Sequence, residues 1–356
     1  MPTTYAIPDG RVAMAATTYT ATPGTGATIS NTVNGVSFQP DLLWVKNRDN
    51  VEQHYWQDSV RGFSPSANVT KMLNSNSTAA ESSLADITCT TTSSGFTVVD
   101  SVPASGEFWF TNRTYVGWQW KANGAAVTNT AGSITSQVSA NTTAGFSIVT
   151  YTGNATSGAT VGHGLGVAPR FIIIKSRVNA FDWIVYHASI GNTAALRLNT
   201  TAAADTDSTW FNNSGPSSTT FTLGNTGGTN NSSSNFVAYC FAAVAGYSAF
   251  GSYTANASSD GPFIYTGFRP RWIMLKRTSA AGAPWSMFDT SRNTYNSTNL
   301  ELDANTVSSE STSGSGMDIL SNGFKLRDAV YLNSSNGDNF IWAAFAENPL
   351  KYANAR

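Results

Sequence analysis

The sequence is poor in charged side chains, which make up 12% of its 356 residues. Globular proteins average about 25%, so the polar surface must come from Ser, Thr, Asn and Gly, which favour turns and short strands over helices. The net charge is −1, and the 20 basic residues are scattered along the chain. Because no basic stripe is present to neutralise a phosphate backbone, the sequence argues against nucleic acid as a partner.

Long apolar runs are also missing, since no run approaches the ~20 residues that a membrane helix needs. The N-terminal stretch lacks the basic start and apolar region of a secretory signal peptide. We therefore expect no membrane partner and synthesis in a reducing cytoplasm. The only cysteines are Cys89 and Cys240, and two free buried thiols are a better interpretation than a disulfide.

Metal-binding patterns are weak. The three histidines, His54, His163 and His187, show no ligand spacing and are expected to be structural. Residues 47–50 and Asp205 with Asp207 could offer oxygen atoms to calcium, but neither group has enough carboxylates for a convincing site. We predict no metal and no cofactor.

What the sequence does contain is one phrase three times: a proline, a short apolar run and a basic ending. It reads PDLLWVKNR from Pro40, PRFIIIKSR from Pro169 and PRWIMLKR from Pro270. Similar segments follow each copy in the same order, which indicates a tandem of three related units.

The apolar run in each phrase predicts a short strand that is buried on both faces, because it does not alternate with polar residues. The proline marks the entry of the strand, where a missing N–H does least harm. The basic residues are expected to mark its exit into solvent and to serve as a structural repeat; they are Lys46, Arg48, Lys175, Arg177, Lys276 and Arg277.

Each unit continues with an aromatic-rich strand, a Leu-containing segment and two further strands, and an opening strand precedes each proline. About six short strands without helical stretches predict a β-sandwich or jelly roll. The predicted fold is all-β, with three tandem antiparallel β-sandwich units.

We place the units at residues 26–125, 126–248 and 249–356, after an N-terminal docking segment at residues 1–25. The small, polar stretch 122–140 is the best linker candidate. The second junction, at residues 245–251, is short and aromatic, so we expect units 2 and 3 to pack together.

Catalytic patterns are not evident. Asp58 with Arg61 and Asp289 with Arg292 are carboxylate–guanidinium pairs, but unit 2 has His187 and Ile190 at the matching positions. Local ion pairs that fix a turn explain them better than a catalytic constellation. We predict no catalytic residues and no enzyme activity.

Aromatic residues are abundant, with 10 Trp, 13 Tyr and 19 Phe. Most belong to strands, but some fall in expected loops, where rings can stack on a sugar while amides bind its hydroxyl groups. The candidate ligand-binding residues are Tyr55, Trp109, Trp210, Arg292 and Tyr295.

Four phrases carry a resemblance to a family. They are residues 40–61, GHGLG from Gly162 with the phrase from Pro169, DGPFIYTGFRP from Asp260, and SNGFKLR from Ser321 with FAENP from Phe345 to the C-terminus. They resemble repeat-bearing virion and tail-fibre proteins of tailed bacteriophages, whose units look like concanavalin-like or laminin-G-like sandwiches.

The resemblance implies a virion structural protein and leaves three roles open. The first is a tail-fibre adhesin that binds host surface polysaccharide. The second is a capsid decoration or head-fibre protein, and the weakest is a polysaccharide depolymerase. It also implies contact with other virion proteins, through the N-terminal segment, and a homo-oligomer, with a trimer favoured.

Overall fold

The structure is a computed structural model that describes residues 6–22, 26–63, 70–84, 87–100, 109–312, 316–327, 329 and 331–348. It is all-β, as predicted, and every pairing between its strands is antiparallel. The helices are single turns, namely η1 (Gly10–Val12), η2 (Ala188–Ile190), α1 (Ser208–Phe211) and α2 (Gly227–Asn230). Among the described residues, no helix has the length and hydrophobicity to cross a membrane.

Repeat 1 (residues 14–120) has a main sheet of four strands in the order β1 (Met14–Thr20), β9 (Thr114–Trp120), β3 (Leu42–Asn47) and β4 (His54–Asp58). A second sheet contains β2 (Gly26–Ser30), β8 (Gly95–Asp100) and β7 (Ile87–Thr92). A separate ribbon pairs β5 (Thr70–Met72) with β6 (Ser82–Leu84).

Repeat 2 (residues 127–241) has an eight-stranded main sheet. Its order is β10 (Val127–Asn129), β11 (Ser136–Asn141), β12 (Phe146–Thr152), β19 (Asn235–Phe241), β14 (Phe171–Ser176), β15 (Ile184–His187), β16 (Ala194–Arg197) and β17 (Asp205–Thr206). The pair β13 (Thr160–Gly162) and β18 (Thr220–Thr222) forms its second sheet.

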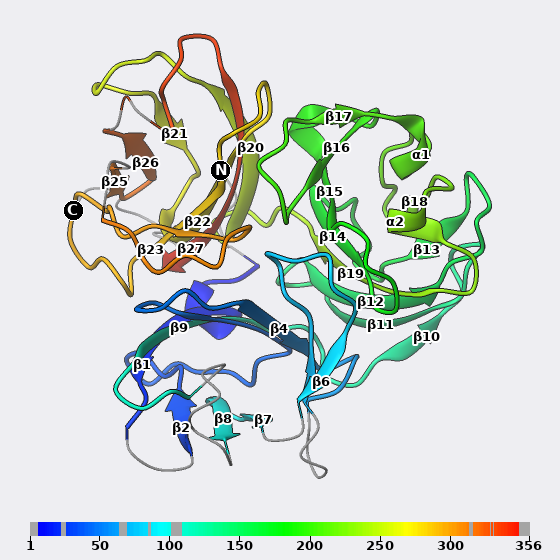
Figure 1. Ribbon diagram of the computed structural model, residues 1–356, viewed down its shortest axis with the longest axis horizontal. Coiled ribbons are helices and arrows are strands. Elements are labelled where there is room, and N and C mark those ends of the chain that lie inside the picture. The colour runs from blue at the N-terminus through cyan, green and yellow to red at the C-terminus, as the bar shows by residue number, and fades with distance from the viewer. Residues whose placement is uncertain are drawn as a thin grey trace.

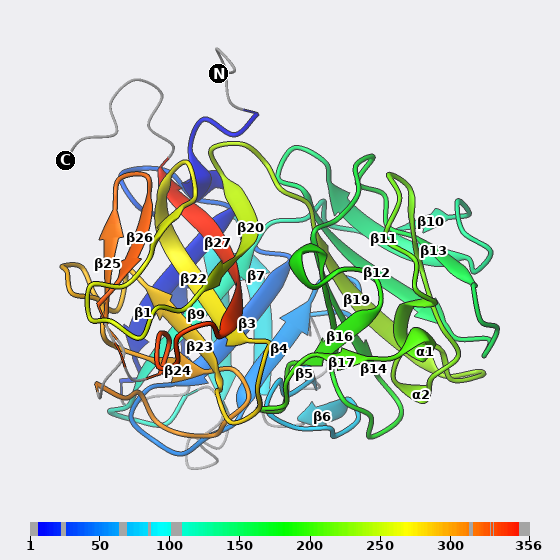
Figure 2. The same ribbon diagram turned by 90° about the horizontal axis from the view of Figure 1, so that it is seen from above.

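Repeat 3 (residues 248–348) has a five-stranded main sheet in the order β20 (Ser248–Thr254), β27 (Asn339–Asn348), β22 (Arg269–Arg277), β23 (Trp285–Asp289) and β24 (Leu302–Asp303). Its second sheet contains β21 (Phe263–Tyr265), β26 (Gly323–Leu326) and β25 (Met317–Leu320). The three repeats are arranged around a common centre, as the three lobes of Figure 1 and the turned view of Figure 2 show.

The three main sheets share one strand order. In each sheet, the opening strand of the repeat pairs with the closing strand, which is the last main-sheet strand of that repeat (β9, β19 or β27). The closing strand pairs on its other side with the strand after the proline, and that strand pairs with the aromatic-rich strand. The predicted opening strands are confirmed as β1, β12 and β20. The sequence repeat therefore corresponds to a repeat of topology.

The predicted linker belongs largely to repeat 2. Residues 127–141 form the hairpin of β10 and β11, which pairs with β12 and widens the main sheet. The expected N-terminal segment also differs from the structure, because β1 begins at Met14 and pairs with β9. Ahead of it, η1 lies against β27 of repeat 3, where a Cβ on Gly10 would meet the Ala346 carbonyl oxygen at 2.5 Å. Within the predicted units, residues 1–5, 23–25, 64–69, 85–86, 101–108, 313–315, 328, 330 and 349–356 lie outside the described residues.

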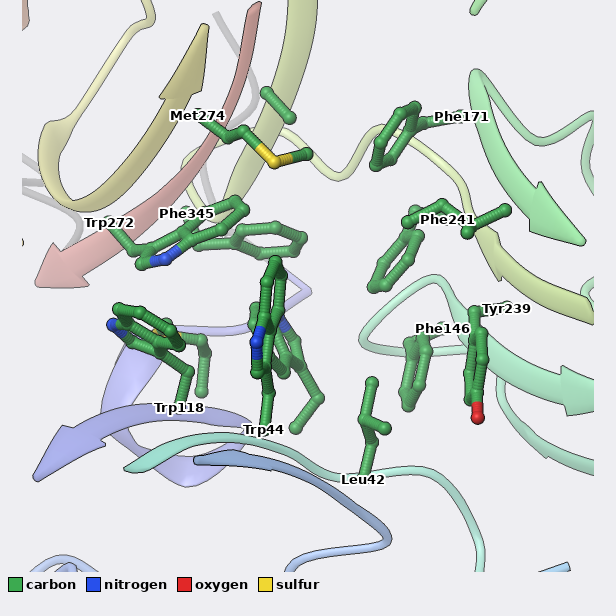
Figure 3. Packing of buried hydrophobic residues seen from close by; sticks show 14 of the residues in the cluster. Leu42, Trp44, Trp118, Phe146, Phe171, Tyr239, Phe241, Trp272, Met274 and Phe345 are labelled. Carbon is green, nitrogen blue, oxygen red and sulfur yellow. The ribbon is translucent and has the colours of Figure 1, made fainter. Parts of the chain in front are cut away.

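The inner faces of the three main sheets form one central core. At its centre, matching residues of the three closing strands meet: the ring centroids of Trp120 and Phe241 are 6.3 Å apart, and each lies 5.7 Å from that of Phe345. Figure 3 shows the side chains of this core converging from the three repeats. The whole chain thus shares one hydrophobic centre.

The strand after each proline is buried on both faces, as predicted, and the structure shows what covers each face. In β3, Leu42 and Trp44 enter the central core, whereas Leu43 and Val45 enter the core between the two sheets of repeat 1. The same alternation holds for β14 and β22. A continuous apolar run is therefore required, because alternate side chains face different cores.

The repeat lysines do not mark an exit into solvent, as the sequence suggested. Lys46, Lys175 and Lys276 are buried, because strand alternation turns them toward the seams between repeats. Lys46 Nζ donates to the Val307 carbonyl of repeat 3 at 3.2 Å, and Lys175 Nζ donates to the Thr78 carbonyl of repeat 1 at 3.0 Å. Each of these two ammonium groups also donates to the backbone carbonyl of the next residue in its own repeat, Asn47 or Ser176.

The third lysine spans the seam between repeats 3 and 2. Lys276 Nζ donates to the Thr201 carbonyl of repeat 2 at 3.2 Å. Each repeat thus donates to the one before it, and repeat 1 donates to repeat 3. Burial lowers the pKa of all three lysines to about 8.

The basic residues beside the lysines belong to an ionic network at two seams. Glu81 of repeat 1 accepts from Arg177 Nε of repeat 2 at 2.9 Å and from Arg61 Nη1 at 3.1 Å. Glu310 of repeat 3 accepts from Arg48 of repeat 1 at 2.7 Å and from Arg292 at 3.0 Å. The predicted Asp–Arg pairs are confirmed, and they extend across seams.

Arg277 does not occupy the position in repeat 3 that is equivalent to Arg48 in repeat 1 and Arg177 in repeat 2. The backbone N–H of Ala204 donates to the carbonyl of Thr278, as that of Glu81 does to Arg177, so Thr278 is the matching residue. Arg277 instead pairs with Asp338 at 3.1 Å. Among the described residues, the seam between repeats 2 and 3 therefore has none of the network residues. His187, Ile190 and Ala204 stand at the positions of Asp58, Arg61 and Glu81, and Thr278 stands at the position of Arg177.

His187 takes the place of the network aspartate. Its Nδ1 accepts from the Ser189 N–H at 3.1 Å, so Nε2 carries the proton and donates to the Trp342 carbonyl of repeat 3 at 3.1 Å. Burial lowers its pKa from 6.5 to about 4. The folded protein holds this imidazole in the neutral form.

We predict that Asp289→Asn lowers the free energy of unfolding by about 3 kcal/mol, because it takes a carboxylate from a buried arginine. Arg292 Nε lies 2.6 Å from Asp289 Oδ2, and both side chains are fully buried. Chemical denaturation measures the change. The control Asp205→Asn affects a pair with side chains 26% and 43% exposed and should cost less than about 1 kcal/mol. Equal losses in the two variants would contradict the prediction.

We also predict a pH-dependent contribution from His187. The unfolded imidazole takes up a proton below about 6.5, whereas the folded one stays neutral to about 4, so its stabilising effect is complete above pH 6.5 and decreases as the pH falls. The stability advantage of the wild type over His187→Asn should shrink by about 3 kcal/mol between pH 7 and pH 4. An Asn can still accept from the Ser189 N–H but does not titrate. Parallel pH profiles of unfolding free energy would refute the prediction.

Candidate functional site

A cavity of about 900 Å³ opens at the seam between repeats 3 and 1. Its volume is within the ~300–1,000 Å³ typical of ligand pockets. The lining residues come from the N-terminal segment and the turn after β2, from one end of the main sheet of repeat 3, and from β25 and two loops of the same repeat. They are Arg11, Val33, Asn34, Arg269, Arg271, Thr290, Thr294, Tyr295, Asn296, Ile319, Leu320, Ser321, Asn322 and Glu347.

A β-bulge at the start of β22 places Arg271 in this cavity. Pro270 pairs with Ala346 and Trp272 with Phe345, so Arg271 has no residue opposite it in β27. The extra residue of a bulge re-aims its side chain. The matching residues elsewhere are Asp41, which accepts from the Ala122 and Gly124 N–H groups, and the exposed Arg170.

The three arginines of the cavity are held differently. Arg11 forms an ion pair with Asp9 at 2.6 Å, and Arg269 pairs with Glu347. Arg271 is 4% exposed, and its Nε has no hydrogen-bond partner in the part of the chain that the structure describes. Burial lowers the pKa of the Arg271 guanidinium, while Glu347 partly offsets this effect.

The loop between β23 and β24 presents Tyr295. The Asn293 side chain accepts from the N–H groups of Asn299 and Leu300, at 3.1 and 2.7 Å. The Asn296 amide exchanges two hydrogen bonds with the backbone of Ile319. These bonds leave the side chain of Tyr295 84% exposed beside the cavity. An exposed ring on an ordered loop can stack on the apolar face of a ligand.

The structure brings one of the five candidate ligand-binding residues to the cavity surface. Tyr295 lines it, whereas Arg292 lies beneath the same loop in its ion pair with Asp289. Tyr55 and Trp109, which we expected in exposed loops, are 5% and 2% exposed within the core of repeat 1. Trp210 is partly buried against the core of repeat 2, with Arg197 over its ring.

Sequence reasoning missed Arg11, Arg269 and Arg271. Arg271 follows the strand proline just as Arg170 does in repeat 2, so its sequence context did not distinguish it. Arg11 is far from both in the sequence and reaches the cavity only because η1 packs on repeat 3.

Other candidate chemistry is accounted for by structure. Within the described ranges, no group of three or more His, Cys, Asp or Glu residues could hold a metal ion. The carboxylates considered for calcium have partners, since Asp49 accepts from Thr114, Asp205 from Arg197, and Asp207 caps α1. Cys89 and Cys240 are free and buried, and burial raises their pKa.

A family model described as a domain of unknown function, DUF7483, matches residues 14–349. No curated protein and no solved structure matches the chain. The matched region covers all three repeats and every residue that lines the cavity except Arg11. The chain belongs to the DUF7483 family, a family of domains of unknown function.

Proposed function

We propose that this protein is an adhesin-type virion protein of a bacteriophage, and that it binds host surface polysaccharide in the cavity between repeats 3 and 1. The observation that carries the proposal is the combination of an exposed tyrosine with amide and hydroxyl side chains around one hollow. Tyr295 offers a ring for stacking, and Asn34, Ser321 and Asn322 offer polar groups. Sugar-binding sites use this combination, because a pyranose has an apolar face and hydroxyl edges.

Binding is favoured over cleavage by the carboxylates of the cavity. Glycoside hydrolysis generally uses two carboxyl groups on either side of the scissile bond. Among the lining residues Glu347 is the single carboxylate, and it is paired with Arg269. We therefore rank a depolymerase below an adhesin.

Each repeat is, in this proposal, a concanavalin-like β-sandwich of jelly-roll type. The separate core between the two sheets of each repeat supports a sandwich. The antiparallel sheets and the single-turn helices agree with this class of fold.

The virion location and the virion partners rest on the sequence resemblance. Contact with other virion proteins through the N-terminal segment, residues 1–25, also stays a prediction. Within that segment, η1 packs on β27 of repeat 3 and residues 14–20 form β1. A homotrimer stays a prediction. The cyclic contacts within one chain already close a ring of three repeats, which reduces the need for further copies at those seams.

A glycan array probed with the full chain tests the proposal. We expect selective binding to one or a few bacterial surface glycans, and Tyr295→Ala should weaken that binding about threefold to tenfold through loss of ring stacking. The control Tyr331→Ala removes another exposed tyrosine that does not line the cavity. Binding that is unaffected by Tyr295→Ala, or that is absent from the array, would contradict the proposal.

A further inference from the structure

Arg271 is a buried cation, 4% exposed, that lines the cavity. Among the described residues, none accepts a hydrogen bond from its guanidinium, and its Nε is enclosed without a partner. Burying an unpaired charge is costly, and buried arginines are normally paired with a carboxylate. The bulge that places Arg271 in the cavity therefore maintains an unfavourable arrangement in the free protein.

The charge balance of the cavity favours an anionic ligand. Its lining has three arginines and one glutamate. Asp9 neutralises Arg11, and Glu347 neutralises Arg269, which leaves the charge of Arg271 in excess. A planar guanidinium can bind a carboxylate through a pair of parallel hydrogen bonds.

We propose that the cavity binds an acidic pyranose, with the sugar carboxylate on Arg271 and the ring against Tyr295. The inference rests on the proposed function and narrows it to sugars that carry a carboxylate, such as uronic and sialic acids. Tyr295 and Arg271 line the same hollow, so one ligand can reach both. Asn322 and Ser321, on the turn between β25 and β26, face the same space and can bind ring hydroxyl groups.

The other seams lack this arrangement. The residue that matches Arg271 is an aspartate in repeat 1, where backbone N–H groups of the segment leading to repeat 2 occupy it. In repeat 2 it is Arg170, which is exposed. The ring thus has three related seams and one acidic-sugar site among the described residues.

Isothermal titration of the full chain tests the inference with four probes. Methyl β-glucuronide and N-acetylneuraminate carry a carboxylate, methyl β-glucoside is the neutral match, and acetate is a carboxylate without a ring. We expect at least one sugar acid to bind more tightly than the neutral glycoside and than acetate. Arg271→Met should weaken that acid at least about tenfold and leave the neutral glycoside unchanged.

Three further variants test whether the planar guanidinium of Arg271 is the group that binds the carboxylate. Arg271→Lys keeps the charge but loses the planar fork, so its affinity for the acid should fall between those of the wild type and Arg271→Met. Glu347→Gln removes the competing carboxylate and should strengthen acid binding. Arg170→Met, at the matching exposed position of repeat 2, should leave binding unchanged. Thermal unfolding of each variant establishes that it is folded.

The outcomes separate the inference from the proposed function. If neither sugar acid binds more tightly than the glucoside, and Arg271→Met leaves binding unchanged, the acidic-sugar inference is overturned and the glycan-binding proposal stands. If acetate binds as tightly as the sugar acids, the cavity recognises a carboxylate without a sugar ring, and the acidic-sugar inference is overturned. No binding of any of the three sugars would overturn the inference, and a glycan array without any binding would overturn the proposed function as well.

Discussion

The structure depends on one constraint: three main sheets share a single hydrophobic core. The closing strands bring Trp120, Phe241 and Phe345 into mutual contact at its centre. Each main sheet must then be apolar on both faces, because its other face packs on the second sheet of its own repeat. Separating the repeats would expose one whole face of every main sheet, so the three repeats need each other to form a stable protein.

At the seams around this core, buried backbone carbonyl groups need hydrogen-bond donors. A lysine from each repeat donates hydrogen bonds to carbonyl groups of the neighbouring repeat, so these carbonyls are not left without partners. Two seams add a network of carboxylates and arginines. At the third seam the four positions of the network differ together, which is expected if a partial network would leave a buried charge unpaired.

The seam between repeats 3 and 1 differs from the others in a way that bears on function. Repeats 3 and 1 are not consecutive in the chain, so no connecting segment crosses between them as residues 122–126 do between repeats 1 and 2. The N-terminal segment packs on β27 instead, and a cavity remains between it and the loops of repeat 3. The proposed glycan site therefore uses a space that the ring geometry creates, and the bulge at Arg271 supplies its charge.

Much of the fold was predictable from local sequence patterns, because a strand shows its pattern of burial in its own residues. The runs after Pro40, Pro169 and Pro270 determined three strands that are buried on both faces, and the repeat determined that three similar units would form. The candidate site was less predictable: Tyr295, which was named from composition and context, lines the cavity, whereas Tyr55 and Trp109 proved to be core residues.

Only the tertiary structure decided what covers each face. An apolar run indicates that both faces are buried, but it contains no information on which sheet lies opposite, so the central core and the burial of Lys46, Lys175 and Lys276 could not be foreseen. The cavity depends on Arg11 and Arg271, which are distant in sequence and meet because η1 packs against repeat 3. Local sequence patterns thus determined the strands, whereas packing between repeats decided where polar groups are buried and where a ligand could bind.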